Sequence, residues 1–330
     1  MDREDYSEID SNIKNWFAIK RKGKEREIEL TVVVELFRFI FYAWFCLTVL
    51  IGVALTYGFT VKENKDFAKI IEGVFGSVNV CAFFDFPPAT YVLPTMYSIQ
   101  MILIYKYSFC SIFRAWIARL ENKISGFAFF FYSFAFAYFF VSALVFSTIF
   151  AVQPDPNNPN TILIHTIPFT NLVIALTILQ IAVTWFGRNV CWKGMRHTSK
   201  LTKRMARFFT YTCLTALIIT SIFKVIHQIN ALSDVWNLTV QANETNKPAE
   251  TKLEYRGIWF NVHAHKNLLQ IVDKLWLISA LVCPMVQSGY LTFKTFHSHL
   301  IIFTVRDNRR ANPAERVTQN GENEHELSLV

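Results

Sequence analysis

The chain has 330 residues, of which 52% are hydrophobic and 32 are phenylalanine, and its formal net charge is +8. This apolar and aromatic content is far above that of a soluble domain of similar size, so the composition excludes a soluble enzyme. The polar residues are gathered into short segments between long apolar stretches. The chain therefore has the composition of a membrane domain rather than of a nucleic-acid-binding protein, and we expect no nucleic-acid partner.

The N-terminal segment, residues 1–32, is polar and carries a basic run from Lys20 to Arg26. A short cleavable signal peptide has only a brief charged region before its apolar core, so this segment does not match one. We expect a basic cytoplasmic segment followed by a first span that itself targets and anchors the protein.

Six apolar stretches lie within residues 33–293. Each meets or exceeds the roughly 20 residues that a helix needs to cross a hydrocarbon layer about 30 Å thick. The sequence therefore predicts an all-α fold, a polytopic membrane protein with six transmembrane helices in one bundle. The predicted spans are residues 33–57, 91–116, 127–152, 161–186, 208–230 and 268–293.

The charges of the connecting segments predict the orientation of this bundle. The fourth loop has seven Lys and Arg residues between residues 187 and 207 and no acid, whereas the third loop, 153–160, carries a single charge, Asp155. Basic loops lie in the cytoplasm, which places the N and C termini there. The fifth loop contains glycosylation sequons at Asn237 and Asn243, which are used only on the opposite side of the membrane. The two signals agree.

The two longer outer loops have different characters. The first becomes apolar over residues 81–88, which include Phe84, Asp85 and Phe86. This run should lie back on the bundle, either as a half-buried lid or as an aromatic interfacial anchor ended by proline. The fifth loop is polar, and we expect it to form a solvated cap.

Charged residues inside spans are costly unless they are paired or face water, so they point to function. Lys224 and His227 lie near the outer end of span 5, and Asp273 and Lys274 lie at a matching depth in span 6. We predict that Lys224 meets Asp273, and that His165 of span 4 belongs to the same intramembrane polar layer. An ion pair that merely orders the bundle is the alternative interpretation.

Near the inner face, Glu35 and Arg38 are three residues apart in span 1 and can pair on one helical face. Snorkelling of these two side chains to the interface is the alternative.

Some features resemble a known family. The short third loop runs directly into Ile164 and His165, the basic fourth loop ends in Arg204-Met205-Ala206-Arg207, and a polar fifth loop precedes the last span. In this layout the chain resembles the six-span family of DRAM autophagy modulators and Frag/PGAP-type factors acting on GPI-anchored proteins. Those relatives commonly have an acidic residue after the histidine, where this chain has Thr166, and their last-span acid corresponds loosely to Asp273. The resemblance implies a role in autophagy, GPI-protein maturation or membrane-lipid handling.

The C-terminal segment, residues 294–330, is predicted to be a disordered cytoplasmic tail because it is mostly polar. It ends in Ser328, Leu329 and Val330, which matches a ligand of PDZ domains: an apolar C-terminal residue with serine two positions before it. An inert tail is the alternative.

Catalytic motifs are missing from the sequence. It has no Walker-type lysine loop and no HExxH motif, and His263 and His265 are spaced for a metal on an extended strand but lack a third ligand. We therefore expect no enzymatic activity, no cofactor and no metal.

The leading hypothesis is a non-enzymatic membrane protein with a regulatory or lipid-associated role. An ion channel or transporter subunit is one alternative, although it needs a continuous polar face and only spans 2, 5 and 6 offer polar residues for one. A receptor or scaffold tethered through the tail is another. The expected partners are membrane lipid, a PDZ-domain protein and further subunits in a homo- or hetero-oligomer. The expected location is the secretory or endomembrane system, with Golgi, lysosome and plasma membrane all open.

Overall fold

A computed structural model of the chain describes residues 19–22, 27–59, 84–152, 159–186, 200–245, 262–294 and 300–306. Six helical segments in these ranges are long and apolar enough to cross a membrane, as the sequence predicted. The protein is therefore a multi-pass membrane protein whose span-sized elements are all helical.

The helices follow the predicted spans closely, with two extensions. The first five spans are α2 (Val34–Phe59), α4 (Ala89–Leu120), α5 (Gly126–Phe146) with a 3-10 turn (Ser147–Phe150), α6 (Pro159–Phe186) and α8 (Lys200–Thr245). The sixth consists of α9 (Val262–Leu277), a π-helical turn (Ile278–Val282) and α10 (Cys283–Lys294). Pro284 follows this turn, and because proline has no N–H it cannot donate the regular helical hydrogen bond there.

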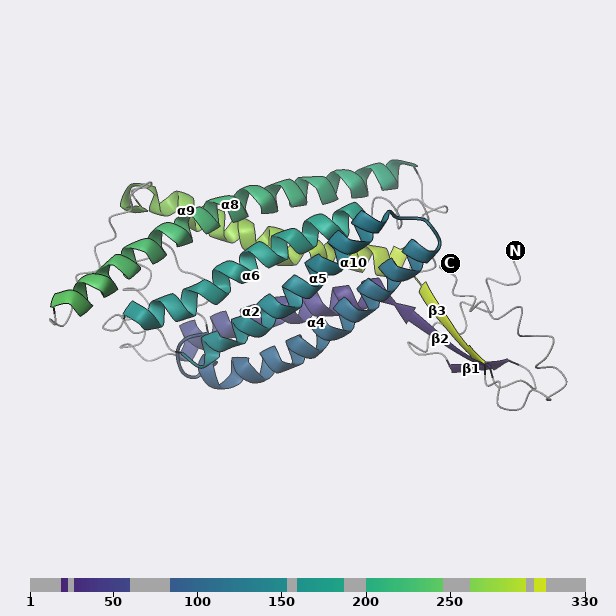
Figure 1. Cartoon of the computed structure of the whole chain (residues 1–330), viewed down its shortest axis with the longest axis horizontal. Coiled ribbons are helices and arrows are strands. Elements are labelled where there is room, and N and C mark those ends of the chain that lie inside the picture. The colour runs from purple at the N-terminus through teal and green to yellow at the C-terminus, as the bar shows by residue number, and fades with distance from the viewer. Residues whose placement is uncertain are drawn as a thin grey trace.

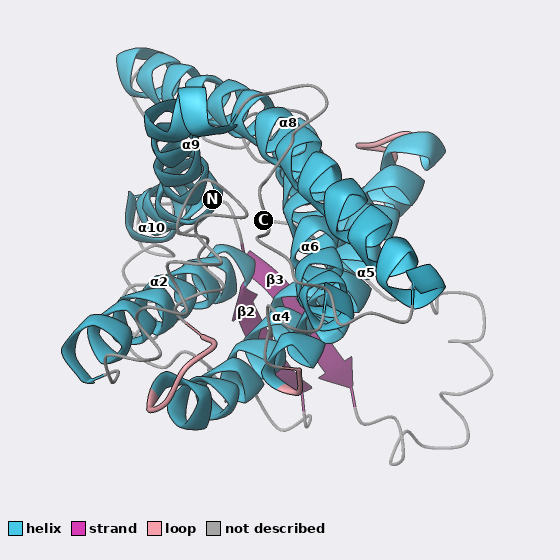
Figure 2. Cartoon of the chain, turned by 90° about the vertical axis from the view of Figure 1, so that its left-hand side faces the viewer, coloured by secondary structure: helices cyan, strands magenta, loops and turns pink. Residues whose placement is uncertain are grey.

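The helices run side by side along the long axis of the bundle (Figure 1) and form a closed ring when viewed along it (Figure 2). Each helix packs on the next in chain order, and α10 completes the ring by packing on α2. The most enclosed span is α6. In its most apolar segment 67% of the residues are buried, against at most 44% in any other described span. The core is therefore centred on α6, where Val173, Leu176 and Leu179 are fully buried.

The third span, α5, has two distinct faces. Phe127, Phe130 and Phe134 are exposed on the apolar outside, whereas Ala135 and Phe136 are buried against the neighbouring helices. Ser125 starts this helix, since its hydroxyl accepts a hydrogen bond from the backbone N–H of Ala128 at 3.2 Å. A short turn joins α4 to α5, and its Asn122 has a φ of 55°, the left-handed conformation typical of a helix C-terminus.

A small antiparallel sheet adjoins the helical bundle. Its strands are β1 (Ile19–Lys22), β2 (Glu27–Val33) and β3 (Leu300–Arg306), in the order β1-β2-β3. Figure 1 shows it at the end of the bundle where α2 begins. The sequence-based interpretation did not anticipate these strands, because it treated residues 294–330 as one polar tail. The β-branched and aromatic run in Leu300–Arg306 has high strand propensity and pairs along the whole of β2.

The fifth span differs from its prediction at one end. It was expected to end at residue 230 and to lead into a polar cap, but α8 continues through Asn237 and Asn243 to Thr245. Residues 231–245 contain neither proline nor glycine, so loss of apolarity alone does not end the helix. At about 1.5 Å per residue, a helix of 46 residues extends well beyond a bilayer core.

Candidate functional site

Three charged side chains from two helices form a buried cluster, which we call the arginine cluster: Glu35, Arg38 and Arg114. Glu35 Oε2 lies 3.3 Å from Arg38 Nη1, and its Oε1 lies 3.0 Å from Arg114 Nη1. Only 2% of Glu35, 1% of Arg38 and 2% of Arg114 is exposed. The predicted Glu35–Arg38 pair is therefore confirmed, and the snorkelling alternative is wrong because Arg38 points into the bundle.

Two glutamines connect Arg38 to the rest of the bundle. Its Nη2 donates hydrogen bonds to Gln180 Oε1 at 3.3 Å and to Gln287 Oε1 at 2.9 Å. Gln180 also donates to the Tyr42 hydroxyl, and Gln287 donates to Thr210 Oγ1 at 2.9 Å. One guanidinium group thus joins α2, α6, α8 and α10 through a continuous polar network.

A narrow crevice lies on the other side of these glutamines, between α8 and α10, with part of α6 as its back wall. We call it the α8–α10 crevice, and its volume is about 20 Å³, which is room for roughly one water molecule. Phe209 on its lining is 38% exposed, so the crevice reaches the outer surface of the bundle. Its polar lining residues are Gln180, Thr184, Thr210, Ser279 and Gln287.

The second charged group is the lysine pair, Lys224 and Asp273, and it confirms the predicted contact between spans 5 and 6. Lys224 Nζ donates to Asp273 Oδ1 and lies 5.0 Å from the ring centre of Phe169 and 4.9 Å from that of Trp276. Two aromatic faces and one carboxylate therefore balance this buried cation. Of the predicted neighbours, His227 is buried on α8, whereas Lys274 is exposed on α9 and does not belong to the buried layer.

The third group is the histidine pair, Asp85 and His165. His165 is buried one helical turn before Phe169, but its Nε2 lies 3.1 Å from Asp85 Oδ1 rather than in the lysine pair. His165 Nδ1 lies 3.2 Å from the Val152 carbonyl oxygen. Burial raises the pKa of the Asp85 carboxyl above its ordinary value of 3.8, and His165 opposes this shift.

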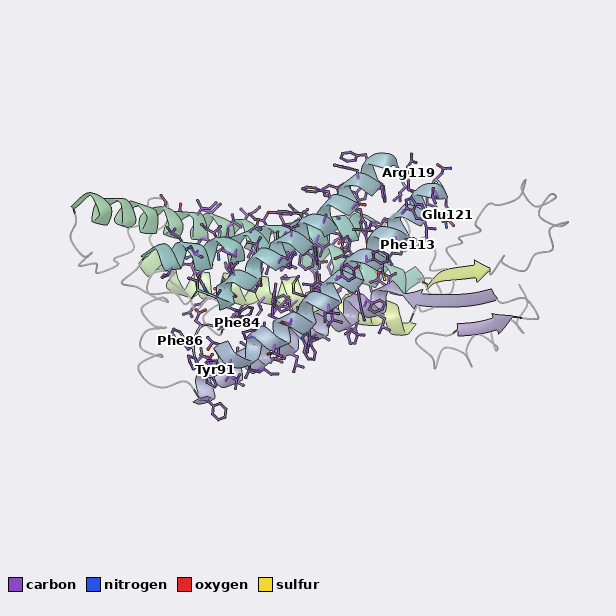
Figure 3. All side chains as sticks on the ribbon, turned by 60° about the horizontal axis from the view of Figure 1, so that its bottom comes forward. Phe84, Phe86, Tyr91, Phe113, Arg119 and Glu121 are labelled. Atoms are coloured by element: carbon purple, nitrogen blue, oxygen red, sulfur yellow. The ribbon has the colours of Figure 1, made fainter. Side chains whose placement is uncertain are left out.

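The Asp85 segment tests the two interpretations of the apolar run 81–88, of which the structure describes residues 84–88. Phe84 and Phe86 are buried, and the Phe84 ring packs edge-on against Phe150 with centroids 5.9 Å apart. Figure 3 shows both residues at one end of the bundle and Arg119 and Glu121 at the other. Residues 84–86 are thus part of the bundle end, as in the lid interpretation, and not an interfacial anchor.

A row of polar contacts joins α6 to α8 between these groups. Thr170 donates to Gln228 Oε1 at 3.0 Å, and Thr177 donates to Ser221 Oγ at 2.8 Å. Trp276 Nε1 donates to the same Ser221 oxygen at 3.0 Å. Span 4 therefore carries a buried polar face, although the sequence predicted polar residues only for spans 2, 5 and 6.

Several residues of this network were missed in the sequence. Arg114 lies near the end of the predicted second span, but its contact with Glu35 on the first span was not predicted. Gln180 and Gln287 were overlooked because uncharged amides do not interrupt an apolar stretch. The signal that could have found them is helical spacing: Thr170, Thr177 and Thr184 recur every seven residues on one face of span 4.

Other sequence predictions are not tested by these contacts. Asn237 and Asn243 lie on α8, and their glycosylation stays a prediction. His263 and His265, which were assigned to the outer loop, lie in the first turn of α9. The C-terminal residues Ser328, Leu329 and Val330 lie outside the described residues. In the described part of the chain, no three His, Cys, Asp or Glu side chains gather as a metal site.

Comparison with protein-family models, with curated proteins and with solved structures finds no match. The resemblance to the DRAM and Frag/PGAP-type family stays a prediction, and functional inference depends on the geometry of this chain.

Proposed function

We propose that this chain is a non-enzymatic membrane protein with a regulatory or lipid-associated role, and that it acts through the α8–α10 crevice. The observation that carries the proposal is a crevice within the spans that has both polar and apolar lining residues and opens at the outer surface of the bundle. Polar groups inside a membrane protein are costly, so polar side chains at such an opening favour a bound headgroup or partner. Autophagy and the handling of GPI-anchored proteins, both implied by the family resemblance, are processes in which such a lipid role would operate.

A lipid-occupancy measurement tests the proposal. The full chain is purified in mild detergent, and the lipids it retains are identified and counted by native mass spectrometry. Leu214→Trp places a large ring in the crevice, because Leu214 is one of its lining residues. We expect this variant to lose the retained lipid that the wild type keeps.

The matched control is Ile222→Trp, which adds the same ring two turns further along α8 at a side chain that is 54% exposed. It should retain lipid as the wild type does. Equal retention by the wild type and Leu214→Trp would rule out the crevice as a lipid site.

The proposed orientation has N and C termini in the cytoplasm and the α8 extension outside, supported by the basic loops and the sequons. Expression in cells tests it. Endoglycosidase treatment should lower the apparent mass of the wild type on a gel but not that of an Asn237→Gln/Asn243→Gln variant. The same tagged protein tests the proposed secretory or endomembrane location against Golgi, lysosome and plasma-membrane markers.

A transporter is the second candidate, because the polar contacts between α6 and α8 form a row along the bundle from the lysine pair toward the arginine cluster. They form a packed row, and a transported ion would have to separate Thr177 from Ser221. Flux of ions or protons into vesicles containing the purified chain, reduced by a Thr177→Val/Ser221→Ala variant, would support transport. Absence of flux would exclude it.

A further inference from the structure

The second span carries a lysine in its middle. Lys106 lies in α4, which runs from Ala89 to Leu120. At about 1.5 Å per residue, roughly 26 Å of helix precedes Lys106 and roughly 21 Å follows it. The whole hydrocarbon layer is about 30 Å thick, so this lysine lies far from both membrane surfaces.

Contacts with the third span place Lys106 at the same depth. The ring centre of its neighbour Tyr105 lies 6.4 Å from that of Phe140. The ring centre of Tyr107, on the other side, lies 5.1 Å from that of Phe136. Both phenylalanines are near the middle of the third span, which has 25 residues. The helix length and the packing therefore agree that Lys106 is at mid-membrane.

The side chain of Lys106 is exposed on the outside of the bundle. Its helix lies on the perimeter of the ring, packed on α2 and α5 (Figure 2). Tyr107 is buried against these neighbours, whereas Lys106 is on the exposed side of α4. Within the described ranges, no hydrogen bond or ion pair involves Lys106.

Snorkelling to a membrane surface does not account for this lysine. The four-carbon stem of a lysine side chain is much shorter than the length of α4 on either side of Lys106. The Cα–Cβ bonds of a helix also point toward its N-terminus, which in α4 is the more distant end. The ammonium group therefore stays at the depth of the hydrocarbon, where a charge without a partner is costly.

An exposed aromatic surface surrounds Lys106. Tyr105, Phe109 and Phe113 follow one another every four residues on one face of α4, and their ring centres are 6.3 and 6.5 Å apart. Ile102, one turn before Lys106, is 56% exposed, and Phe109 is 59% exposed. We call Ile102, Tyr105, Lys106 and Phe109 the α4 surface. Its apolar side chains are ordinary for a helix that faces lipid, but the cation at its centre is not.

An acid from the spans of a second copy of this chain does not fit Lys106. The acidic residues in the six described spans are Glu35 and Asp273. Glu35 is 2% exposed and contacts two arginines, and Asp273 is paired with Lys224. The complementary charge at this depth must therefore come from a different protein.

We infer that the α4 surface binds a transmembrane helix of another protein, and that this helix carries an aspartate or glutamate that pairs with Lys106. Charges inside membranes pair with one another, and the weak screening of an apolar medium strengthens their attraction. The exposed rings of Tyr105 and Phe109 supply apolar contact around the pair. This inference goes beyond the proposed function and does not depend on the α8–α10 crevice.

Three synthetic peptides test the inference. Each is the same fluorescent transmembrane helix of leucine and alanine, with aspartate, leucine or lysine at its centre. The purified full chain, carrying an acceptor dye, is reconstituted with each peptide in phosphatidylcholine vesicles, and binding is measured by energy transfer. We expect the aspartate peptide to bind on the order of tenfold more tightly than the leucine peptide, the effect of one polar contact between membrane helices. Equal binding would overturn the inference.

Charge reversal identifies the residue that is responsible. Lys106→Leu should bind the aspartate and leucine peptides equally, and Lys106→Asp should prefer the lysine peptide. Lys106→Leu makes an exposed side chain more apolar in a lipid-facing position, so this variant should fold as the wild type does. Lys274→Leu, the same change at an exposed lysine of α9, should keep the wild-type preference. A preference for aspartate that survives in Lys106→Leu would overturn the inference.

A second pair of variants locates the binding surface. Phe109→Ala removes a ring of the α4 surface and should weaken binding of the aspartate and leucine peptides alike. Phe130→Ala removes a similarly exposed ring from α5 and should leave both unchanged. Equal effects of these two variants would overturn the placement of the site on α4.

Other occupants of the α4 surface would give different results. The peptide measurement is repeated in vesicles that contain phosphatidylserine. Loss of the aspartate preference there would show that an anionic headgroup takes the place of the acid, and would overturn the inference. Self-association of the wild type, counted by single-molecule photobleaching and lost in Lys106→Leu, would make a second copy the occupant and would also overturn it.

Discussion

The arginine cluster and the lysine pair are both buried in the spans, yet their charges are balanced differently. In the lysine pair one cation meets one carboxylate, and two aromatic rings cover the remaining faces of Lys224. In the arginine cluster two cations share Glu35, and Arg38 uses the neutral oxygens of two glutamines for its other donors. The lysine pair therefore fixes one contact between α8 and α9, whereas the arginine cluster and its two glutamines tie together α2, α4, α6 and α10.

The largest effect should come from Glu35→Gln. This variant leaves two buried guanidinium groups without their shared carboxylate, and breaking a buried ion pair in this way costs about 3–5 kcal/mol. We expect a marked loss of thermal stability of the purified protein, measured by fluorescence-detected size-exclusion chromatography after heating. The double variant Glu35→Gln/Arg114→Met restores the wild-type net charge and should recover part of the loss. No recovery would show that the loss does not come from repulsion between the two guanidinium groups.

A smaller effect is expected from Asp273→Asn. The Asp273 side chain is 15% exposed, so water screens part of the interaction, and Lys224 keeps its two aromatic neighbours. We expect a destabilisation of about 1–3 kcal/mol in the same assay, the usual range for leaving a partly buried partner unmatched. The Lys224→Met/Asp273→Leu variant should be less destabilised than the single variant. A loss as large as that of Glu35→Gln would remove the distinction between the two groups.

The histidine pair should make the stability of the folded protein depend on pH. Because the pKa of Asp85 is raised in the folded state, its contribution to stability is fully present below the ordinary value of 3.8 and is lost as pH rises through the folded-state pKa. Asp85→Asn removes this group, so the variant should lose less stability than the wild type over that interval. Parallel profiles of thermal midpoint against pH for the two proteins would contradict the burial argument.

The smallest effect is expected from Lys274→Ala. This side chain is exposed and next in sequence to Asp273, so its removal should change stability by no more than ~0.5 kcal/mol. A large loss would mean that Lys274, and not Lys224 alone, balances Asp273.

Parts of the candidate site could be predicted from sequence and parts could not. The depth of a residue in a span follows from counting along a helix, so Lys224 and Asp273 could be matched between spans 5 and 6 with no structure. The partner of His165 could not be found in this way. Asp85 lies outside the spans, and its position depends on how the Phe84 and Phe86 rings pack at the bundle end.

The sequence by itself determined the six spans and the contact between Lys224 and Asp273, because apolarity and helical rise are local properties of the chain. Only the tertiary structure decided that Arg114 enters the bundle, that Gln180 and Gln287 meet at Arg38, and that a crevice opens beside them. These contacts depend on how each helix is rotated and which helices are neighbours. A hydropathy pattern gives no information on either, because a helix turned about its axis still crosses the membrane.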